Sequence, residues 1–144
     1  YLSDMPEESF IAHRDTLHRN KRYTDSTPAS IAGVIYPKSI LIHPKADVKR
    51  GEAIFAATGG TSFCASVGIE DSTSGRGSVS FIVDLFINGE WKNAFTSPVM
   101  GGGDAAVPIS VPLNDAAKIR LICTDGGDGV SSDHGVWALP RIIP

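Results

Sequence analysis

Hydrophobic and polar residues alternate along this chain in short runs, and glycine or proline separates one run from the next. The clearest run spans 77–87, where every second residue from Val79 onwards is apolar and Ser78, Ser80 and Asp84 point to the other face. Alternation with a period of two is typical of a β-strand that buries one face and exposes the other. We therefore predict a strand here, with Val79 and the alternate apolar residues facing the core.

A two-residue turn follows this strand, because Asn88 and Gly89 both tolerate the positive φ angles of a type I′ hairpin. The returning strand is predicted over 90–96. The same alternation recurs over 118–123, which is a second clear strand. Weaker runs predict further strands over 31–36, 39–43, 52–57, 61–69, 107–113 and 135–143.

About eight strands separated by turns predict an all-β fold in which two antiparallel sheets pack as a β-sandwich of the jelly-roll type. The first 30 residues show little periodicity and are predicted to form a long loop with at most one helical turn. The 144 residues fit a single domain spanning 1–144, which would bury about two thirds of its unfolded surface. Because the first residue is Tyr1 and not Met, we expect the chain to be processed or cut from a longer protein.

Composition narrows the possible partners. Thirteen Lys and Arg stand against 16 Asp and Glu, and no basic stripe with interleaved aromatic residues occurs, so nucleic acid is not an expected partner. No apolar run approaches about 18 residues, so we expect no membrane insertion, and a monomer is favoured. Cys64 and Cys123 lie in predicted core strands without the spacing of a zinc or redox site. Free, buried thiols are favoured over a disulfide, which stays an alternative.

Acidic, glycine-rich segments fall at the predicted strand ends, over 70–77, 101–104 and 125–133. Such loops can gather side chains around a hydroxyl-rich ligand or a calcium ion, which prefers six to eight oxygen ligands. Alternatively, glycine, aspartate and serine simply form tight turns, and this is their more frequent role. The carboxylates of 125–133 do not follow the EF-hand pattern.

No catalytic residue is predicted. The chain lacks the GxSxG nucleophile elbow, so an esterase or hydrolase is a weak alternative, and it lacks the P-loop and dinucleotide-binding fingerprints. His43 ends an apolar strand and His134 follows Asp133. A histidine in such a place is more often a buried hydrogen-bonding residue than a base or a ligand.

The two tryptophans have different surroundings. Trp91 lies on a polar strand just after the hairpin turn, where it either offers a flat ring to the apolar face of a sugar or packs half-buried across the hairpin. Trp137 lies between apolar residues and is predicted to be in the core.

Three stretches then resemble a known family: VGIEDSTSGRGSVSFIV over 67–83, VMGGGDAA over 99–106 and LICTDGGDGVSSDHGVWALPRI over 121–142. They occur, after an opening YLSDM, in the order found in NPCBM domains, also called carbohydrate-binding module family 51. The resemblance covers nearly the whole chain, and the combination of the three stretches is much more specific than any one of them.

The resemblance implies a galactose-binding-like β-sandwich that binds galactose-type or related glycans without acting on them chemically. It also implies a secreted, cell-surface or periplasmic location, and a catalytic domain, usually a glycoside hydrolase, in the same polypeptide. The family pattern, with Trp91 added from the argument above, selects as ligand-binding residues Asp71, Arg76, Asp104, Asp128 and His134. It further implies structural roles for His43 and Trp137, and a structural calcium ion held by Asp125 and Asp133.

The chain departs from the family pattern at several positions. Val136 and Leu139 stand where acids are common, and Glu70 stands where aspartate is usual. If either lost acid belongs to the cation site, calcium binding is weakened or absent. The segment 13–26 also matches poorly. The alternative function is therefore a divergent sandwich that serves as a protein-interaction or spacer domain in a multidomain extracellular protein, without sugar binding.

Overall fold

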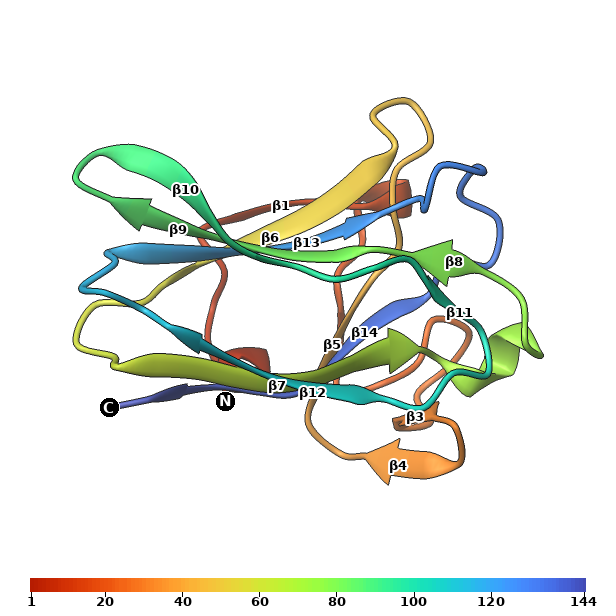
Figure 1. Cartoon of the computed structure of the whole chain (residues 1–144). Coiled ribbons are helices and arrows are strands. Elements are labelled where there is room, and N and C mark those ends of the chain that lie inside the picture. The colour runs from red at the N-terminus through yellow and green to blue at the C-terminus, as the bar shows by residue number, and fades with distance from the viewer.

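The computed structural model describes residues 1–144 and consists of two five-stranded antiparallel sheets packed face to face (Figure 1). The first sheet contains, in spatial order, β1 (Ser9–Ile11), β6 (Arg50–Ala56), β13 (Lys118–Thr124), β9 (Phe81–Ile87) and β10 (Glu90–Thr96). The second contains β12 (Val107–Pro112), β7 (Ser62–Ile69), β14 (Gly135–Ile143), β5 (Ser39–Ile42) and β2 (His18–Arg19). The predicted all-β sandwich is confirmed.

Two small strand pairs and three 3₁₀ helices complete the fold. The pairs are β11 (Met100–Gly101) with β8 (Ser78–Val79), and β3 (Ala29–Ile31) with β4 (Val34–Tyr36). The helices are η1 (Leu2–Asp4), η2 (His13–Asp15) and η3 (Asp71–Thr73). No helix is long and apolar enough to cross a membrane.

The core lies between the two sheets, as the alternation of apolar residues predicts. Val79, Phe81, Val83 and Leu85 are buried there and Ile87 packs against them partly buried. Trp137 is fully buried, and Phe81 lies edge-on to it with 5.4 Å between the ring centroids. The predicted core position of Trp137 is therefore confirmed. Asn88 and Gly89 have φ angles of 52° and 78°, and they join β9 to β10 as the predicted hairpin.

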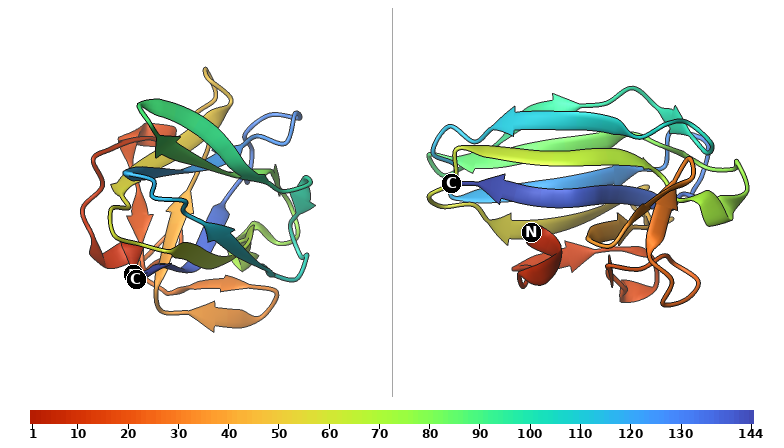
Figure 2. Two further views of the ribbon diagram at one scale, coloured as in Figure 1. Left: turned by 60° about the vertical axis from the view of Figure 1, so that its left-hand side comes forward. Right: turned by 90° about the horizontal axis from the view of Figure 1, so that it is seen from below.

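The β3–β4 hairpin covers the outer face of the second sheet, which Figure 2 shows in its right-hand view. It makes a smaller apolar cluster that contains Ile31, Leu41 and Val136. This second layer explains why every residue of β5 is buried, since its side chains meet the main core on one face and the hairpin on the other. Val136 therefore lies in a closed apolar cluster.

Two predictions about the first third of the chain are wrong. The segment 31–36 is the second half of a hairpin and not one strand, because Ala32 and Gly33 adopt φ angles of 46° and 85° and reverse the chain. The first 30 residues are also more than a loop. They contribute β1 and β2, which are edge strands of the two sheets, but strands of three and two residues are too short to show a periodicity.

Smaller differences concern Ser80 and the cysteines. The predicted strand 77–87 is interrupted at Ser80, which divides it into β8 and β9. Both cysteines are free thiols, as predicted, and Cys123 is buried. Cys64 is only half-buried, because it lies between Phe63 and Ala65 on β7 and therefore points to the outer face of the second sheet.

Candidate functional site

The acidic, glycine-rich segments meet at one end of the sandwich. We call this the loop end, and it comprises 70–78, 100–104, 125–134 and the β3–β4 turn (Figure 1, right-hand side). The strand pair β8–β11 joins the first two segments, and Gly102 N donates a further hydrogen bond to Gly77 O at 3.1 Å. Both chain termini lie towards the opposite end (Figure 1).

Glycines let these loops approach one another closely. A Cβ atom on Gly77 would lie 2.2 Å from the carbonyl oxygen of Ser132, and one on Gly102 would lie 2.3 Å from that of Arg76. Any side chain at either position would push the loops apart, because the obstructing atoms belong to the backbone. Gly77 of the GRG stretch and Gly102 of the GGG stretch are therefore needed for the packing of the loop end.

Ser78 connects three of these segments through aspartates of the 125–134 loop. Its main-chain N–H donates to Asp133 Oδ1 at 2.8 Å, and its hydroxyl donates to Asp128 Oδ1 at 2.7 Å. Asp125 Oδ1 accepts from Gly127 N at 2.9 Å and shapes the same loop. These three carboxylates thus hold the long loop in place beside β8.

The remaining predicted aspartates also make hydrogen bonds within turns. Asp71 accepts from the N–H groups of Ala32 and Gly33, at 2.7 and 2.9 Å, and so closes the β3–β4 turn. Asp104 accepts from Gly101 N at 2.9 Å. All five aspartates therefore make the side-chain contacts that the turn-forming alternative requires.

Glu70, the acid that replaces an aspartate of the family pattern, accepts hydrogen bonds at both oxygens of its carboxylate. One of its carboxylate oxygens accepts from the N–H and hydroxyl groups of Ser72, and the other accepts from the N–H of Ser30 at 3.1 Å and from its hydroxyl at 3.3 Å. It is buried and links η3 to β3. Its contacts are structural.

Arg76 is the predicted ligand-binding residue with the most unused hydrogen-bonding capacity. It is exposed, its Nε donates to Thr73 O at 3.2 Å, and its guanidinium forms no ion pair. Its terminal nitrogens have no partner within the chain, so they can donate to a ligand at the surface of the loop end.

A cluster of aromatic rings stands beside these loops, and we call it the ring cluster. It brings all four histidines of the chain around Tyr23. Tyr23 stacks on His134 with 4.7 Å between ring centroids, and His13 lies 4.5 Å from His43. His18 lies 4.9 Å from Tyr23. Tyr23, His13 and His134 are partly exposed, so the cluster presents ring surface to solvent.

Burial disfavours the charged form of three histidines in this cluster, His18, His43 and His134. Burial lowers the pKa of His134 to about 4, with a smaller contribution from His43, while Glu70 acts in the opposite direction. Burial likewise lowers the pKa of His18 and of His43. Desolvation, and secondarily the neighbouring cationic groups, disfavour protonation, so these three rings are uncharged at neutral pH. Both ring nitrogens of His18 and Nδ1 of His134 are buried without a partner.

The sequence predicted part of this cluster. His43 is buried and its Nδ1 lies 2.9 Å from the carbonyl oxygen of Pro44, as expected of a structural histidine. Tyr23 and His13 were not predicted, because they lie in the segment without periodicity that matches the family poorly. The only sequence feature that pointed to them is the concentration of histidines at 13 and 18.

Trp91 is not part of the loop end. It lies on the outer face of the first sheet, where its ring and that of Phe86 pack edge to face across the hairpin, with 5.1 Å between the ring centroids. The guanidinium group of Arg120 lies 4.2 Å from the centroid of the Trp91 ring. Arg120 is fixed in turn by Asp84, at 2.8 Å. The packing across the hairpin is the arrangement given by the second alternative for Trp91.

The donors proposed for calcium do not form a cation site in this arrangement. No group of three or more His, Cys, Asp or Glu side chains is placed to hold a metal ion. Asp133 is fully buried, and burial, with the nearby Asp128 and Asp125, raises its pKa to about 7 although Ser78 donates to it. Val136 cannot contribute, since it lies under the β3–β4 hairpin. The absence of a third side-chain donor beside Asp125 and Asp133 argues against the calcium ion implied by the resemblance, whose binding stays a prediction.

A model of the NPCBM/NEW2 domain family matches residues 1–143. Among curated proteins, the chain is 30% identical over 149 residues to a "putative endo-alpha-N-acetylgalactosaminidase" of Renibacterium salmoninarum. The match covers 99% of this chain but only 9% of that protein, so the chain corresponds to a small part of its relative.

Solved structures share the fold over the whole chain. The CBM51 module of Clostridium perfringens GH95, in complex with methyl-galactose, is 25% identical with a TM-score of 0.83, and the match covers 99% of this chain and 97% of that one. The tandem CBM51 modules of Sp3GH98, a family 98 glycoside hydrolase of Streptococcus pneumoniae, give 20% identity and a TM-score of 0.82, over 99% and 46% of the two chains. CBM51-2 of C. perfringens ZmpB, in complex with GlcNAc, is 20% identical with a TM-score of 0.81, and the match covers 98% of this chain and 30% of that one.

Proposed function

The chain belongs to the NPCBM/NEW2 domain family, and we propose that it is a non-catalytic module that binds galactose-type or related glycans at its loop end. The family resemblance seen in the sequence is thereby confirmed. Members of this carbohydrate-binding module family are typically non-catalytic, and the chain is a single small domain of that kind. The sugar, the position of its site and the enzyme it accompanies are our proposals.

The observation that carries the loop-end site is the partly exposed stack of Tyr23 on His134. The C–H groups on one face of a pyranose pack well against aromatic rings, whose bodies are apolar and whose edges carry polar atoms. Arg76 supplies unused N–H donors on the neighbouring segment. The free carboxylate oxygens of Asp104 and Asp128 can accept hydroxyl hydrogens, and Asp71 holds the adjacent turn.

The galactose-type ligand is supported by the CBM51 module that was solved with methyl-galactose, which matches this chain end to end. Glycan units of other kinds are known among structural relatives, since one was solved with GlcNAc. A shallow site for a polar ligand gains little free energy after desolvation, so the dissociation constant should be roughly micromolar to millimolar.

We propose further that the module is a monomer and brings an attached catalytic domain to an extracellular glycan. Relatives occur next to such domains: one structure contains the M60 catalytic domain together with CBM51-1 and CBM51-2 of ZmpB, and another belongs to a family 98 glycoside hydrolase. The loop end points away from both termini, so an attached domain leaves it accessible (Figure 1).

The test is a glycan-array screen of the folded domain, with galactose-terminated and related oligosaccharides, in calcium and in chelator. Three variants locate the site: Tyr23→Ala and Arg76→Ala at the loop end, and Trp91→Ala on the outer face of the first sheet as the comparison. Selective binding that is lost in the first two and kept in the third supports the proposal. Loss only in Trp91→Ala moves the site to the sheet face, and a blank array from folded protein favours the spacer or interaction role.

A further inference from the structure

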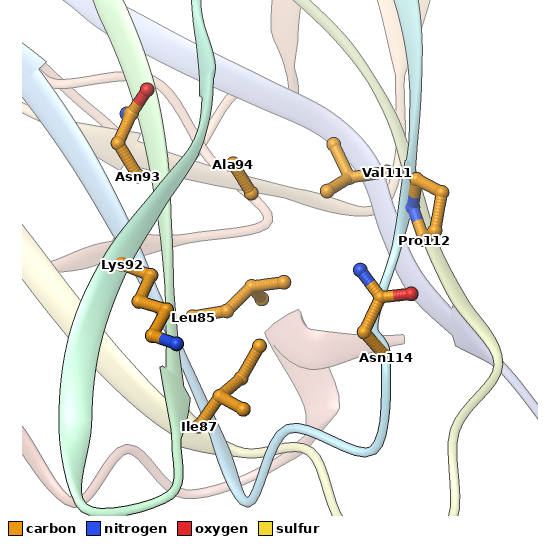
Figure 3. A pocket seen from close by; sticks show the side chains of 8 residues that line it. All are labelled: Leu85, Ile87, Lys92, Asn93, Ala94, Val111, Pro112 and Asn114. Carbon is orange, nitrogen blue, oxygen red and sulfur yellow. The ribbon is translucent and has the colours of Figure 1, made fainter.

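The cavity of this molecule is not at the loop end. It lies on a flank of the sandwich, between β10, an edge strand of the first sheet, and β12, an edge strand of the second (Figure 3). We call it the flank pocket. Its volume is about 240 Å³, and its lining consists of Leu85, Ile87, Lys92, Asn93, Ala94, Val111, Pro112 and Asn114.

The floor of the flank pocket is apolar and belongs to the core. Leu85 and Val111 come from opposite sheets and are only 1% and 3% exposed, and Ile87 packs against the same core cluster. The register of the β9–β10 ladder shifts between Asn93 and Phe95, so Ala94 lies in a β-bulge. Because this position carries only a methyl group, the space between the two edge strands stays open.

Two polar groups with no partner in the chain stand over this floor. Lys92 pairs with Leu85 across the hairpin, so its side chain projects from the inner face of the first sheet towards the pocket (Figure 3). It takes part in no ion pair, and no acidic side chain lines the cavity. Asn114, from the opposite wall, directs its amide into the same space, whereas the Asn93 amide is used by Asp84.

The edge strands around the pocket do not suit a bound peptide strand. Pro108 and Pro112 remove two N–H donors from β12, and the bulge at Ala94 interrupts β10. An added strand would need a continuous row of free backbone groups. The pocket therefore favours a compact ligand, and its volume lies slightly below the range of roughly 300–1,000 Å³ found for drug-sized ligands.

We propose that the flank pocket is a second binding site, for a single acidic sugar unit that carries both a carboxylate and an N-acetyl group. The ammonium group of Lys92 binds the carboxylate in a charge-assisted contact. The N-acetyl methyl group packs on Leu85 and Val111, and the Asn114 amide pairs with the N-acetyl group or a hydroxyl. A plain neutral hexose fits less well, because its hydroxyls would face the apolar floor without partners.

This inference rests on the proposed function only in taking the ligand to be a glycan unit. The flank pocket shares no residue with the loop end, and the end of β9, the start of β10 and the end of β12 that line it lie towards the opposite end of the sandwich (Figure 1). The two sites can therefore be occupied together, by different parts of one glycan or by separate chains.

The experiment follows the methyl NMR signals of Leu85, Ile87 and Val111 during titration with the methyl glycoside of N-acetylneuraminic acid. N-acetylglucosamine lacks its carboxylate and glucuronic acid lacks its N-acetyl group, and both serve as comparison ligands. We expect saturable shifts with the acidic N-acetylated sugar and at least about tenfold weaker binding of the other two, since each lacks one anchoring contact.

Three variants test the contacts. Lys92→Gln removes the charge, Asn114→Gly removes the amide while tolerating the positive φ of 50°, and Ala94→Phe fills the space from an exposed position. We expect about tenfold weaker binding in the first two and none in the third. Lys49→Gln is the matched control, because Lys49 is also exposed and without an ion pair, and it should bind as the unmodified chain does.

Two results would overturn the inference. One is the absence of methyl shifts at roughly 20 mM ligand, where a millimolar site would be filled. The other is unchanged binding in Lys92→Gln together with self-association of that variant, which would mean that Lys92 only protects the sheet edge. Arg76→Ala should leave the flank shifts unchanged, so a failure of the loop-end proposal is recognised separately.

Discussion

The main-chain N–H of Ser78 donates a 2.8 Å hydrogen bond to Oδ1 of Asp133, across 55 residues of sequence. The other carboxylate oxygen of Asp133 is buried without a partner. One carboxyl group thus joins the first strand of the GRGSV stretch to the long loop before β14, and it does so in an environment that favours its neutral form.

Replacing this carboxyl group should change how stability depends on pH. The pKa of Asp133 is raised from 3.8 to about 7 in the folded chain, so the folded state holds an extra proton between these values and stability falls as pH rises through them. Asp133→Asn keeps the acceptor for Ser78 and removes the titration. The free energy of unfolding of the variant should therefore rise relative to that of the unmodified chain as the pH goes from 4 to 8. Because each unit of pKa shift corresponds to 1.36 kcal/mol, we expect this relative increase to reach up to about 4 kcal/mol.

Urea unfolding at several pH values measures this difference in the free energy of unfolding. Asp115→Asn is the control for the loss of one carboxyl group, because Asp115 is exposed and its side chain makes no hydrogen bond or ion pair. Curves for Asp133→Asn that run parallel to those of the unmodified chain would show that Asp133 ionises normally.

His134 should act in the opposite sense over an overlapping range. Its pKa falls from 6.5 to about 4 on folding, so the unfolded chain binds the extra proton and stability is lost as pH falls from 6.5 towards 4. His134→Phe keeps a ring against Tyr23 and cannot be protonated. We expect the unmodified chain to lose up to about 3 kcal/mol relative to this variant across that range. The same urea series provides the measurement, and a pH-independent difference would contradict the prediction.

The sequence predicted the fold where patterns were long. Strands β9 and β13 each span seven residues and bury every second side chain, so their alternation is clear, and the Asn88–Gly89 turn predicted β10 from β9. The β3–β4 hairpin was missed because Ala32 continues an apolar run, and the turn is set by contacts with Asp71 far along the chain. Tertiary contacts of this kind leave no local pattern.

The candidate site was predicted only in part, for the same reason. The loops that hold Arg76, Asp104 and Asp128 contain recognisable motifs, and the structure brings them together. Tyr23 belongs to the ring cluster only because its segment folds back against His134. The flank pocket has no motif at all, since strands from two sheets form it.

Two neighbouring glycines offer a matched test of the loop packing. A Cβ on Gly102 would lie 2.3 Å from the carbonyl oxygen of Arg76, whereas one on Gly101 would meet nothing closer than 3.8 Å. We expect Gly102→Ala to lower the free energy of unfolding by about 1–3 kcal/mol, as overpacking does, and Gly101→Ala to change it by less than about 0.5 kcal/mol. Thermal and urea unfolding of both variants check this, and equal effects of the two substitutions would mean that the backbone of residues 75 and 76 moves away from the added Cβ at little cost.

Removal of calcium should leave the domain unchanged. The acids at 125, 128 and 133 use carboxylate oxygens to fix the loop and Ser78, and no group of three or more His, Cys, Asp or Glu side chains is placed to hold a metal ion. A cation that bound only the folded state would raise the midpoint of thermal unfolding as its concentration rose. We therefore expect the same midpoint in excess EDTA and in excess calcium chloride, with magnesium chloride as the control for ionic strength. A rise of several degrees specific to calcium would show that these loops rearrange around the ion, despite Val136 and Leu139.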